Sequence, residues 1–338
     1  MASVDKTLAH VVAEYPLLQP AVEVPDVARY PEAVVTVEQL GSPDSLALAI
    51  AASAERYQLG DKHAAQVWWF SLAHSLTRPA ITAMVEFFVV PSLDLDRGTL
   101  FHRVGDAGLD PYWCGFRPGA LNECAHGSAG EGLVQEVLKA LPGREVLDAV
   151  ARERDAWDLD EEEFAQLVGC AQSAQQLVRS IRPLLESLCA ASGLRPAPLW
   201  AVLGDSLIAH AADSGNESFD PQRGYLVAQA LYAGMADVMP RPRFEVVRDG
   251  QLLALAAPSA DDDTAAGEDA GVPAATNAAR VMASVSGGGG IDPDDHLFAR
   301  RASCCMIYHS PTAEKCTSCP KHTPQERSQR LLSYVASL

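Results

Sequence analysis

The sequence lacks a segment that could span a membrane and lacks a recognisable export signal. Its strongest apolar run, residues 83–90, is interrupted by Glu86, whereas a spanning helix needs about 20 consecutive apolar residues. Asp5 and Glu14 interrupt the opening stretch, and no apolar core with a cleavage site follows them. We therefore expect a cytoplasmic protein without stable membrane insertion, in which cysteine thiols stay reduced.

Positive charge is also scarce. The 338 residues include 26 Lys and Arg against 44 Asp and Glu, which gives a formal net charge of −18. Because nucleic-acid binding needs a basic face to contact phosphates, this balance argues against a nucleic-acid partner. The deficit is uneven: residues 297–338 carry a net charge of +4, so residues 1–296 carry −22.

The sequence shows no motif for nucleotide binding or acid–base catalysis. Residues 287–290 are four glycines, but no strand is predicted before them and no Gly-Lys-Ser/Thr sequence ends them. No pairing of a nucleophile with a base stands out. We therefore expect no catalytic acid or base and no nicotinamide or flavin site in this chain.

The pattern of apolar and turn residues predicts an α+β fold, mostly helical with a small antiparallel sheet. Helices are predicted over residues 45–57, 61–79, 131–156, 161–191, 196–212 and 221–239. Strands are predicted over residues 98–104, 112–117, 244–248 and 252–256, the last two joined by an Asp-Gly turn. Residues 80–90 fit either a buried helix or a strand.

Three segments are predicted along the chain. Residues 1–257 form the helical α+β domain. Residues 258–296 form a flexible, acidic and Gly-rich segment, in which 258–271 hold five acids and no base and 274–285 have a helical pattern. Residues 297–338 form a cysteine loop followed by a short helix. A capping box at Thr323 and Glu326 starts that helix. Its predicted buried face comprises Leu331, Leu332, Val335 and Leu338.

Four of the eight cysteines are grouped near the end of the chain. Cys304 and Cys305 are adjacent, ten residues follow, and then Cys316 and Cys319 form a C-x-x-C motif. The C-x-x-C spacing suits one tetrahedral metal ion because its two sulfurs can converge. Adjacent side chains diverge, so Cys304 and Cys305 bind together only if the backbone turns sharply there. A two-iron cluster relaxes this demand because it offers two metal atoms to four sulfurs.

The other four cysteines are predicted to be structural. Cys170 and Cys189 lie in apolar helical segments, where cysteine behaves as a small hydrophobic residue. Cys114 and Cys124 have a spacing that no common metal site uses. We expect none of the four to bind metal.

The cysteine segment resembles a known family signature. Residues 300–308, Arg-Arg-Ala-Ser-Cys-Cys-Met-Ile-Tyr, and the closing Cys-Thr-Ser-Cys-Pro of residues 316–320 resemble the C-terminal signature of FhuF-type ferric-siderophore reductases. The resemblance implies that Cys304, Cys305, Cys316 and Cys319 bind a [2Fe–2S] cluster. It also implies that residues 1–257 bind a ferric siderophore. Residues 309–315 depart from the family, whose members often have small residues there.

The resemblance implies an oxidoreductase that passes one electron to Fe(III)-siderophore and releases Fe(II). Arg300 and Arg301 precede the cysteines and are predicted to tune the cluster by their positive charge. The acidic main domain favours hydroxamate complexes, which are neutral or cationic. The electron donor is predicted to be a ferredoxin or a flavin-dependent reductase, because this chain has no such site itself.

We expect the residues that bind the ferric chelate to be aromatic and basic groups, which could stack on the chelate or neutralise its charge. The candidates are His102, Arg103, Trp113 and Arg117. Trp68 and Trp69 are further aromatic residues of this kind, but both fall inside an apolar helix, where core packing explains them.

Two other functions use the same cysteines. In the first, the four thiolates hold a structural Zn²⁺ that fixes the last helix, within a binding module that has no redox activity. In the second, an iron–sulfur cluster reports iron or redox state to a partner. The adjacent cysteines and the arginines before them favour iron over zinc.

Overall fold

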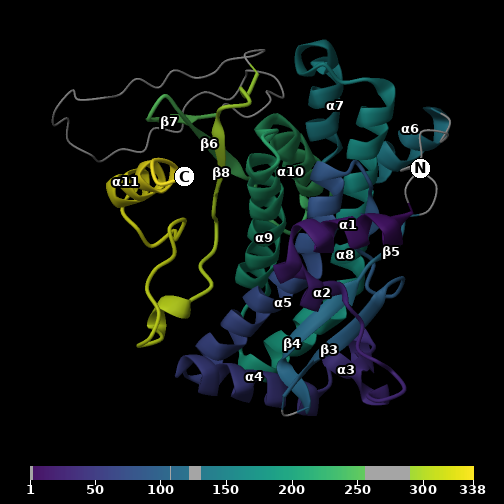
Figure 1. The fold of residues 1–338 in the computed structure, drawn as a ribbon, viewed down its shortest axis with the longest axis vertical. Coiled ribbons are helices and arrows are strands. Elements are labelled where there is room, and N and C mark those ends of the chain that lie inside the picture. The colour runs from purple at the N-terminus through teal and green to yellow at the C-terminus, as the bar shows by residue number, and fades with distance from the viewer. Residues whose placement is uncertain (1–2, 107, 122–130, 256–289) are drawn as a thin grey trace.

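The computed structural model describes residues 3–106, 108–121, 131–255 and 290–338 (Figure 1). Its helices are α1 (Val4–Glu14), α2 (Gln19–Val22), α3 (Val37–Leu40), α4 (Pro43–Tyr57), α5 (Asp61–Glu86), α6 (Glu131–Ala140), α7 (Arg144–Arg152), α8 (Glu161–Ser192), α9 (Pro196–Glu217), α10 (Pro221–Met235) and α11 (Pro324–Val335). Within the described ranges, no helix has both the length and the apolarity to cross a membrane.

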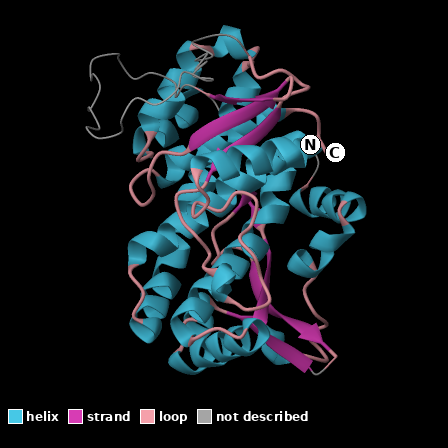
Figure 2. Ribbon diagram, turned by 90° about the vertical axis from the view of Figure 1, so that its left-hand side faces the viewer, coloured by secondary structure: helices cyan, strands magenta, loops and turns pink. Residues whose placement is uncertain are grey.

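The strands form three small antiparallel sheets, which confirms the predicted α+β class. They are β1 (Val34–Val35), β2 (Pro91–Ser92), β3 (Thr99–Gly105), β4 (Gly108–Arg117), β5 (Gly119–Ala120), β6 (Arg243–Arg248), β7 (Gln251–Ala254) and β8 (His296–Arg300). The sheet orders are β1-β3-β4, β2-β5 and β7-β6-β8. The two three-stranded sheets lie at opposite ends of the helical body (Figure 2).

Local turn and capping signals predicted their elements correctly. The β6–β7 turn places Asp249 and Gly250 at φ 50° and 71°, the left-handed conformation that Asp-Gly hairpin turns adopt. At the start of α11, Thr323 Oγ1 accepts from the Glu326 amide at 3.2 Å, and Glu326 Oε2 accepts from the Thr323 amide at 2.9 Å. Both features depend on residues close together in sequence.

Helix α5 corrects the prediction that a helix ends at Pro79. It runs through the proline to Glu86, so residues 80–86 of the ambiguous stretch 80–90 are helix and residues 87–90 are neither helix nor strand. An interior proline costs a helix about 3 kcal/mol. Burial of Ile81, Met84 and Val85, each at most 2% exposed, outweighs this cost, since each contributes about 1.5–3 kcal/mol.

Other boundaries shift because of packing. The predicted helix over 131–156 divides into α6 and α7 at Gly143, whose amide donates to Ala233 of α10 at 2.9 Å. A Cβ on Gly143 would lie 2.8 Å from the Ala233 Cα, so the close approach of α10 requires glycine there. Helix α9 extends to Glu217, beyond the predicted end at 212, and α10 ends at Met235 rather than 239.

The last helix has a smaller buried face than predicted. Leu331 is buried, and Leu332 is half-buried. Val335 is half-buried as well. Leu338 is 77% exposed because it lies beyond the helix end, where it lines a pocket. The acidic segment 258–271 and the predicted helix over 274–285 fall outside the described residues.

Helices α5 and α9 lie side by side and run in the same direction. Trp69 Nε1 donates to the Leu199 carbonyl at 2.9 Å near their starts. Further along, the His210 ring contacts Thr77 at 3.1 Å. Residue numbers therefore rise together along both helices, and the two share one face toward the C-terminal segment.

The C-terminal segment runs back along α9. Asn216 exchanges two hydrogen bonds with the backbone of Leu297 in β8, at 2.9 and 2.8 Å. About three turns earlier on α9, Asp205 accepts hydrogen bonds from the amides of Ala302 and Ser303. This antiparallel path carries the cysteines to the first half of α5 and α9.

Candidate metal centre

Three side chains of the helical body hold the cysteine loop. Asp205 accepts from the Ala302 and Ser303 amides at 2.9 and 2.7 Å, just before the cysteine pair. Gln66 Nε2 donates to the Cys304 carbonyl at 2.7 Å. The His63 ring stacks on His309 with a centroid distance of 4.1 Å. The loop is therefore fixed to α5 and α9 through its backbone and through one ring.

The thiols of Cys304 and Cys319 come from opposite ends of the loop. Both residues are buried, and their sulfurs lie 3.9 Å apart. Two thiolates on one tetrahedral metal at about 2.3 Å would be separated by about 3.8 Å. This pair is therefore spaced as two ligands of the same metal atom.

A sharp turn follows the adjacent cysteines, at Met306. Its φ of 68° is left-handed, which is uncommon for a residue other than glycine. The turn brings the Met306 amide to 3.4 Å from the Cys304 sulfur, to which it donates. The backbone thus makes the kind of turn that ligation by neighbouring cysteines requires.

Arg301 lies among the remaining thiols. Its Nη1 donates to the Cys316 sulfur at 3.5 Å, and its guanidinium stacks 5.2 Å from the Phe70 ring centroid. Burial acts to lower the pKa of Arg301, but Cys316, Cys305 and Asp205 outweigh burial, so its pKa is raised. The pKa of Cys305 is lowered by the Cys304 thiol, with further contributions from the Ile307 amide and Arg301. The centre therefore stabilises a thiolate at Cys305.

The carboxylate that supports this arrangement is itself buried. The pKa of Asp205 is raised to about 6 because burial outweighs the hydrogen bonds from Ala302 and Ser303 and the charge of Arg301. Its Oδ2 lies 3.9 Å from Arg301 Nε. Sequence reasoning did not identify Asp205, Gln66 or His63 as part of the site. The available signal was an aspartate inside an apolar helix, because such an acid needs a partner.

The donor set fits an anionic metal cluster. Within the described ranges, no group of three or more His, Cys, Asp or Glu side chains converges as a single-ion site. One pair of sulfurs is at chelating separation, and the other two thiols lie near Arg301. Arg301 Nη2 is buried with no hydrogen-bond partner among the described residues. A buried donor of this kind needs an acceptor, which the anionic sulfur of an iron–sulfur cluster supplies.

The two predicted tuning arginines have different surroundings. The Arg301 side chain is 8% exposed and lies beside Cys316, whereas Arg300 is exposed at the end of β8. Successive side chains along an extended chain point to opposite sides, and Arg301 directly follows Arg300, the last residue of β8, so the two side chains diverge. Their electrostatic effect on the thiols should therefore differ.

The predicted docking residues lie on the β3–β4 hairpin. The Arg103 guanidinium stacks 5.2 Å from the Trp113 ring centroid, and His102 Nδ1 contacts the Cys114 sulfur at 3.6 Å. Arg117 pairs with Asp5 at 2.7 Å. Within the described residues, no hydrogen bond, ion pair or ring contact joins these four residues to the loop 301–319.

The cysteine segment matches a known family. Residues 301–321 match the family model described as the FhuF 2Fe-2S C-terminal domain, and these residues include all four clustered cysteines. The match confirms the resemblance predicted from the sequence. No curated protein and no solved structure matches the chain.

Proposed function

We propose that the protein is a siderophore-iron reductase that binds a [2Fe–2S] cluster through Cys304, Cys305, Cys316 and Cys319. The observation that carries the proposal is the match of residues 301–321 to a 2Fe-2S domain, at a place where four thiols gather around a buried arginine. When bound, such a cluster supplies one electron at a time at a potential set by its surroundings.

The sulfur geometry supports a particular sharing of ligands. Cys304 and Cys319 are 3.9 Å apart and would share one iron. Cys305 and Cys316, which lie beside Arg301, would supply the other two thiolates of the cluster. The protein contributes the positive charge of Arg301 near the thiolates. Asp205 and Gln66 contribute by holding the loop backbone.

The chemical step is the addition of one electron to Fe(III) in its chelate. Hard, anionic oxygen donors bind Fe(III) more tightly than Fe(II), so reduction weakens the complex. Fe(II) then leaves and the siderophore is released without a covalent change. The electron comes from an external ferredoxin or a flavin-dependent reductase, which restores the reduced protein. No proton transfer by an acidic or basic side chain is needed.

Metal analysis tests the proposal. Protein purified without oxygen should contain about two iron and two acid-labile sulfides per chain, with visible colour. Dithionite should bleach the colour, and a ferric hydroxamate should restore it with release of Fe(II). One zinc per chain and no colour would overturn the proposal and favour the structural zinc site.

A further inference from the structure

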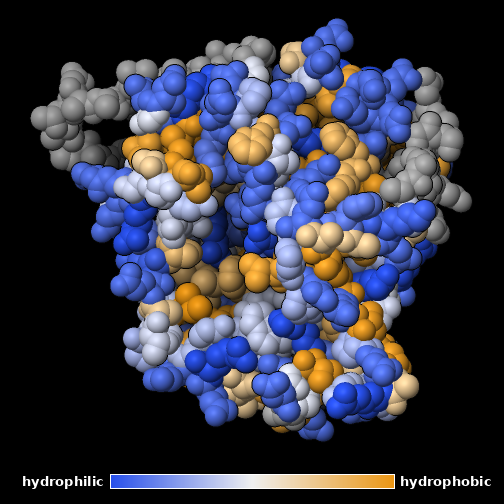
Figure 3. Space-filling view, in the orientation of Figure 1, coloured by the Kyte–Doolittle hydropathy of each residue, from blue (hydrophilic) through white to orange (hydrophobic). Residues whose placement is uncertain are grey.

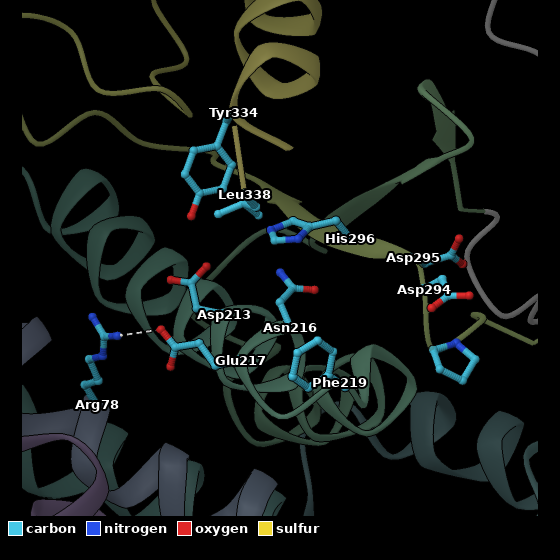
Figure 4. Close-up of a pocket in the computed structure, with 11 residues that line it drawn as sticks. Arg78, Asp213, Asn216, Glu217, Phe219, Asp294, Asp295, His296, Tyr334 and Leu338 are labelled. Atoms are coloured by element: carbon cyan, nitrogen blue, oxygen red, sulfur yellow. Dashed lines mark hydrogen bonds and ion pairs between the residues drawn. The ribbon is translucent and has the colours of Figure 1, made fainter. Parts of the chain in front are cut away.

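A second feature lies farther along the same side of α9. A pocket of about 710 Å³ lies between the end of α9, residues 293–296 and the end of α11. This volume is within the range of about 300–1,000 Å³ that small-molecule sites occupy. Tyr334 and Leu338 face Asp213, Glu217 and Phe219 across it (Figure 4).

The pocket collects exposed apolar side chains. Phe219 is 80% exposed, Leu338 77% and Tyr334 44%, so three of the eight exposed large hydrophobic residues of the described chain line it. Phe219 also has a φ of 58°. A bulky residue in the left-handed region is strained, and such strain is concentrated at functional sites. The fold thus holds an aromatic ring in solvent at some cost.

The charge of the pocket is negative. Four carboxylates line it, those of Asp213, Glu217, Asp294 and Asp295, against one guanidinium, that of Arg78. Glu217 pairs with Arg78 at 3.1 Å, and Asp295 pairs with Arg248 outside the pocket. Asp213 and Asp294 make no hydrogen bond or ion pair within the described residues.

The pocket keeps this negative charge at neutral pH. Burial lowers the pKa of His296, so the ring is neutral at pH 7. The pKa of Asp213 is raised to about 6, mainly because protein surrounds the carboxylate, although it remains accessible from the pocket. At neutral pH Asp213 therefore keeps its negative charge, and His296 adds no positive charge to the pocket.

One face of α5 connects the pocket to the cysteine loop. Phe70, His74 and Arg78 are four residues apart, so they lie along one side of the helix. Arg301 stacks on Phe70, and Arg78 lines the pocket. The two positions are about 12 Å apart along the helix. The surface is hollowed between the C-terminal segment and α9 (Figure 3).

We propose that this pocket binds the ferric chelate. It prefers chelates that have apolar linkers and carry a net positive charge. The inference rests on the proposed reductase function and names its substrate class. Aromatic and apolar walls would contact the linkers of the chelate, and the unpaired carboxylates would attract its cationic group. Phe70, His74 and Arg78 are half-buried along α5 and lead from the pocket toward the cysteine loop, so iron bound in the pocket would lie on the side of the helix that Arg301 contacts.

Binding of a redox-inert chelate tests this assignment without electron transfer. The probe is the gallium(III) complex of desferrioxamine B, a trihydroxamate with one free ammonium group. Its partner is the same complex with that group acetylated, which removes the charge. Affinities are measured by titration calorimetry on the full chain. We expect the cationic complex to bind about tenfold more tightly, which corresponds to about 1.4 kcal/mol.

Variants locate the binding site. Phe219→Ala with Tyr334→Ala should weaken both complexes by about tenfold, because both rings would cover the apolar linkers of the chelate. Asp213→Asn should weaken only the cationic complex. The matched control is Phe88→Ala, which removes another exposed phenylalanine with a left-handed φ of 53° outside the pocket. It should leave both affinities unchanged.

Other outcomes separate the two proposals. Equal affinity for the two complexes would overturn the charge selection. Unchanged affinity in the pocket variants, with loss in Trp113→Ala or Arg103→Ala, would overturn the pocket and favour the β3–β4 hairpin. If the protein holds a cluster and reduces ferric hydroxamate, either result leaves the reductase proposal intact. Pocket-dependent gallium binding by a protein that holds zinc would support the pocket and overturn the reductase.

Discussion

Asp205 and Arg301 support the candidate metal centre in different ways. Asp205 acts through the loop backbone, and Arg301 acts through its charge. The Asp205 carboxylate accepts two amide hydrogen bonds from the residues just before Cys304. The Arg301 guanidinium contacts the Cys316 sulfur. One residue therefore fixes where the loop lies, and the other sets the potential that the thiolates experience.

Loss of the Asp205 charge should reduce metal loading. Asp205→Asn leaves one acceptor for two amides, and a hydrogen bond to a charged group contributes about 1.5–3 kcal/mol. We expect less than about half of the wild-type iron and sulfide content, measured on protein purified without oxygen. Asp213→Asn, two turns later on α9, should retain full content. Equal loading of the Asp205 and Asp213 variants would contradict the positioning role.

Substitution of Arg301 and substitution of Arg300 should change the midpoint potential by different amounts, as measured in an electrochemical titration. Arg301→Gln removes a buried positive charge beside Cys316, which favours the oxidised centre and lowers the midpoint potential. A shift of about 59 mV corresponds to about 1.4 kcal/mol for one electron, so tens of millivolts are expected. Arg300→Gln removes an exposed charge that solvent screens. Equal shifts in the two variants would show that net charge, rather than the Arg301 contact, sets the potential.

At the scale of single residues, the sequence identified the cysteines but not their supports. The four cysteines and Arg301 lie within 19 residues of one another, so their spacing is visible in the sequence. Gln66 is 238 residues from the carbonyl that it contacts. Only packing of α5 against the C-terminal segment joins them, and no local pattern encodes that packing.

Among the elements, the end of α1 contacts α5 through the carboxylate of Glu86. Ionisation of this carboxylate destabilises the folded protein. Glu86, at the end of α5, accepts a hydrogen bond from the Tyr15 hydroxyl at 2.9 Å, and its other oxygen is buried without a partner in the described chain. Burial raises the pKa of Glu86 to about 7. The folded protein therefore binds this proton more tightly than the unfolded chain does.

Glu86→Gln should stabilise the protein above pH 7. The stability that the protonated carboxyl contributes is fully present below its unfolded pKa of 4.5 and is lost as the pH rises through about 7. The amide stays neutral and keeps an acceptor for Tyr15. We expect a gain of about 1–2 kcal/mol at pH 8, allowing for partial exposure, and little change at pH 4. Urea unfolding at both values checks this, with Glu38→Gln on the exposed face of α3 as the control. An equal gain at both values would contradict the raised pKa.

Elements that begin or end at a local sequence signal were predicted correctly. Boundaries that depend on burial against distant helices were not. The Asp249-Gly250 turn and the Thr323 capping box each lie within four residues, and the structure confirms both. Pro79 is also a local signal, and it misled because buried residues after it keep α5 helical. Contacts with distant helices decide such boundaries, so a single sequence does not reveal them.

For the whole molecule, charge is divided between the main body and the end that holds the cysteines. Residues 297–338 carry +4 and the rest carries −22. Arg300, Lys321 and Arg330 are exposed around the cysteine loop and α11. An acidic electron donor such as a ferredoxin would be attracted to this end and repelled elsewhere.

Ionic strength should therefore affect the donor reaction. Reduction by an acidic ferredoxin should slow several-fold as ionic strength rises, since the screening length shortens from about 10 Å at 0.1 M to about 3 Å at 1 M. Lys321→Glu should slow it at low salt. Dithionite reduction of the same variant serves as the control for an intact centre. A ferredoxin rate independent of salt would exclude electrostatic docking at this end.

The pocket could not be predicted from the sequence because segments from distant parts of the chain form it. Its walls come from α5, α9, residues 293–296 and α11, which are far apart in the sequence. The docking candidates on 102–117 were adjacent in sequence, and the structure keeps them together on one hairpin. Neighbouring residues can be grouped from sequence alone, whereas a shared cavity requires the chain path.

A single residue of β6, Glu245, contacts both ends of the segment that contains the four clustered cysteines. Glu245 is opposite Phe298 in the β6–β8 ladder, and its carboxylate binds Arg327 of α11 at 2.7 Å. The chain between Phe298 and Arg327 is thus a ring whose two ends meet at Glu245, with no cysteine taking part in the closure. Closing a free loop of this length costs about 3 kcal/mol in entropy. Contacts outside the cysteines bear that cost, so the four thiols are confined within a ring whose closure involves none of them.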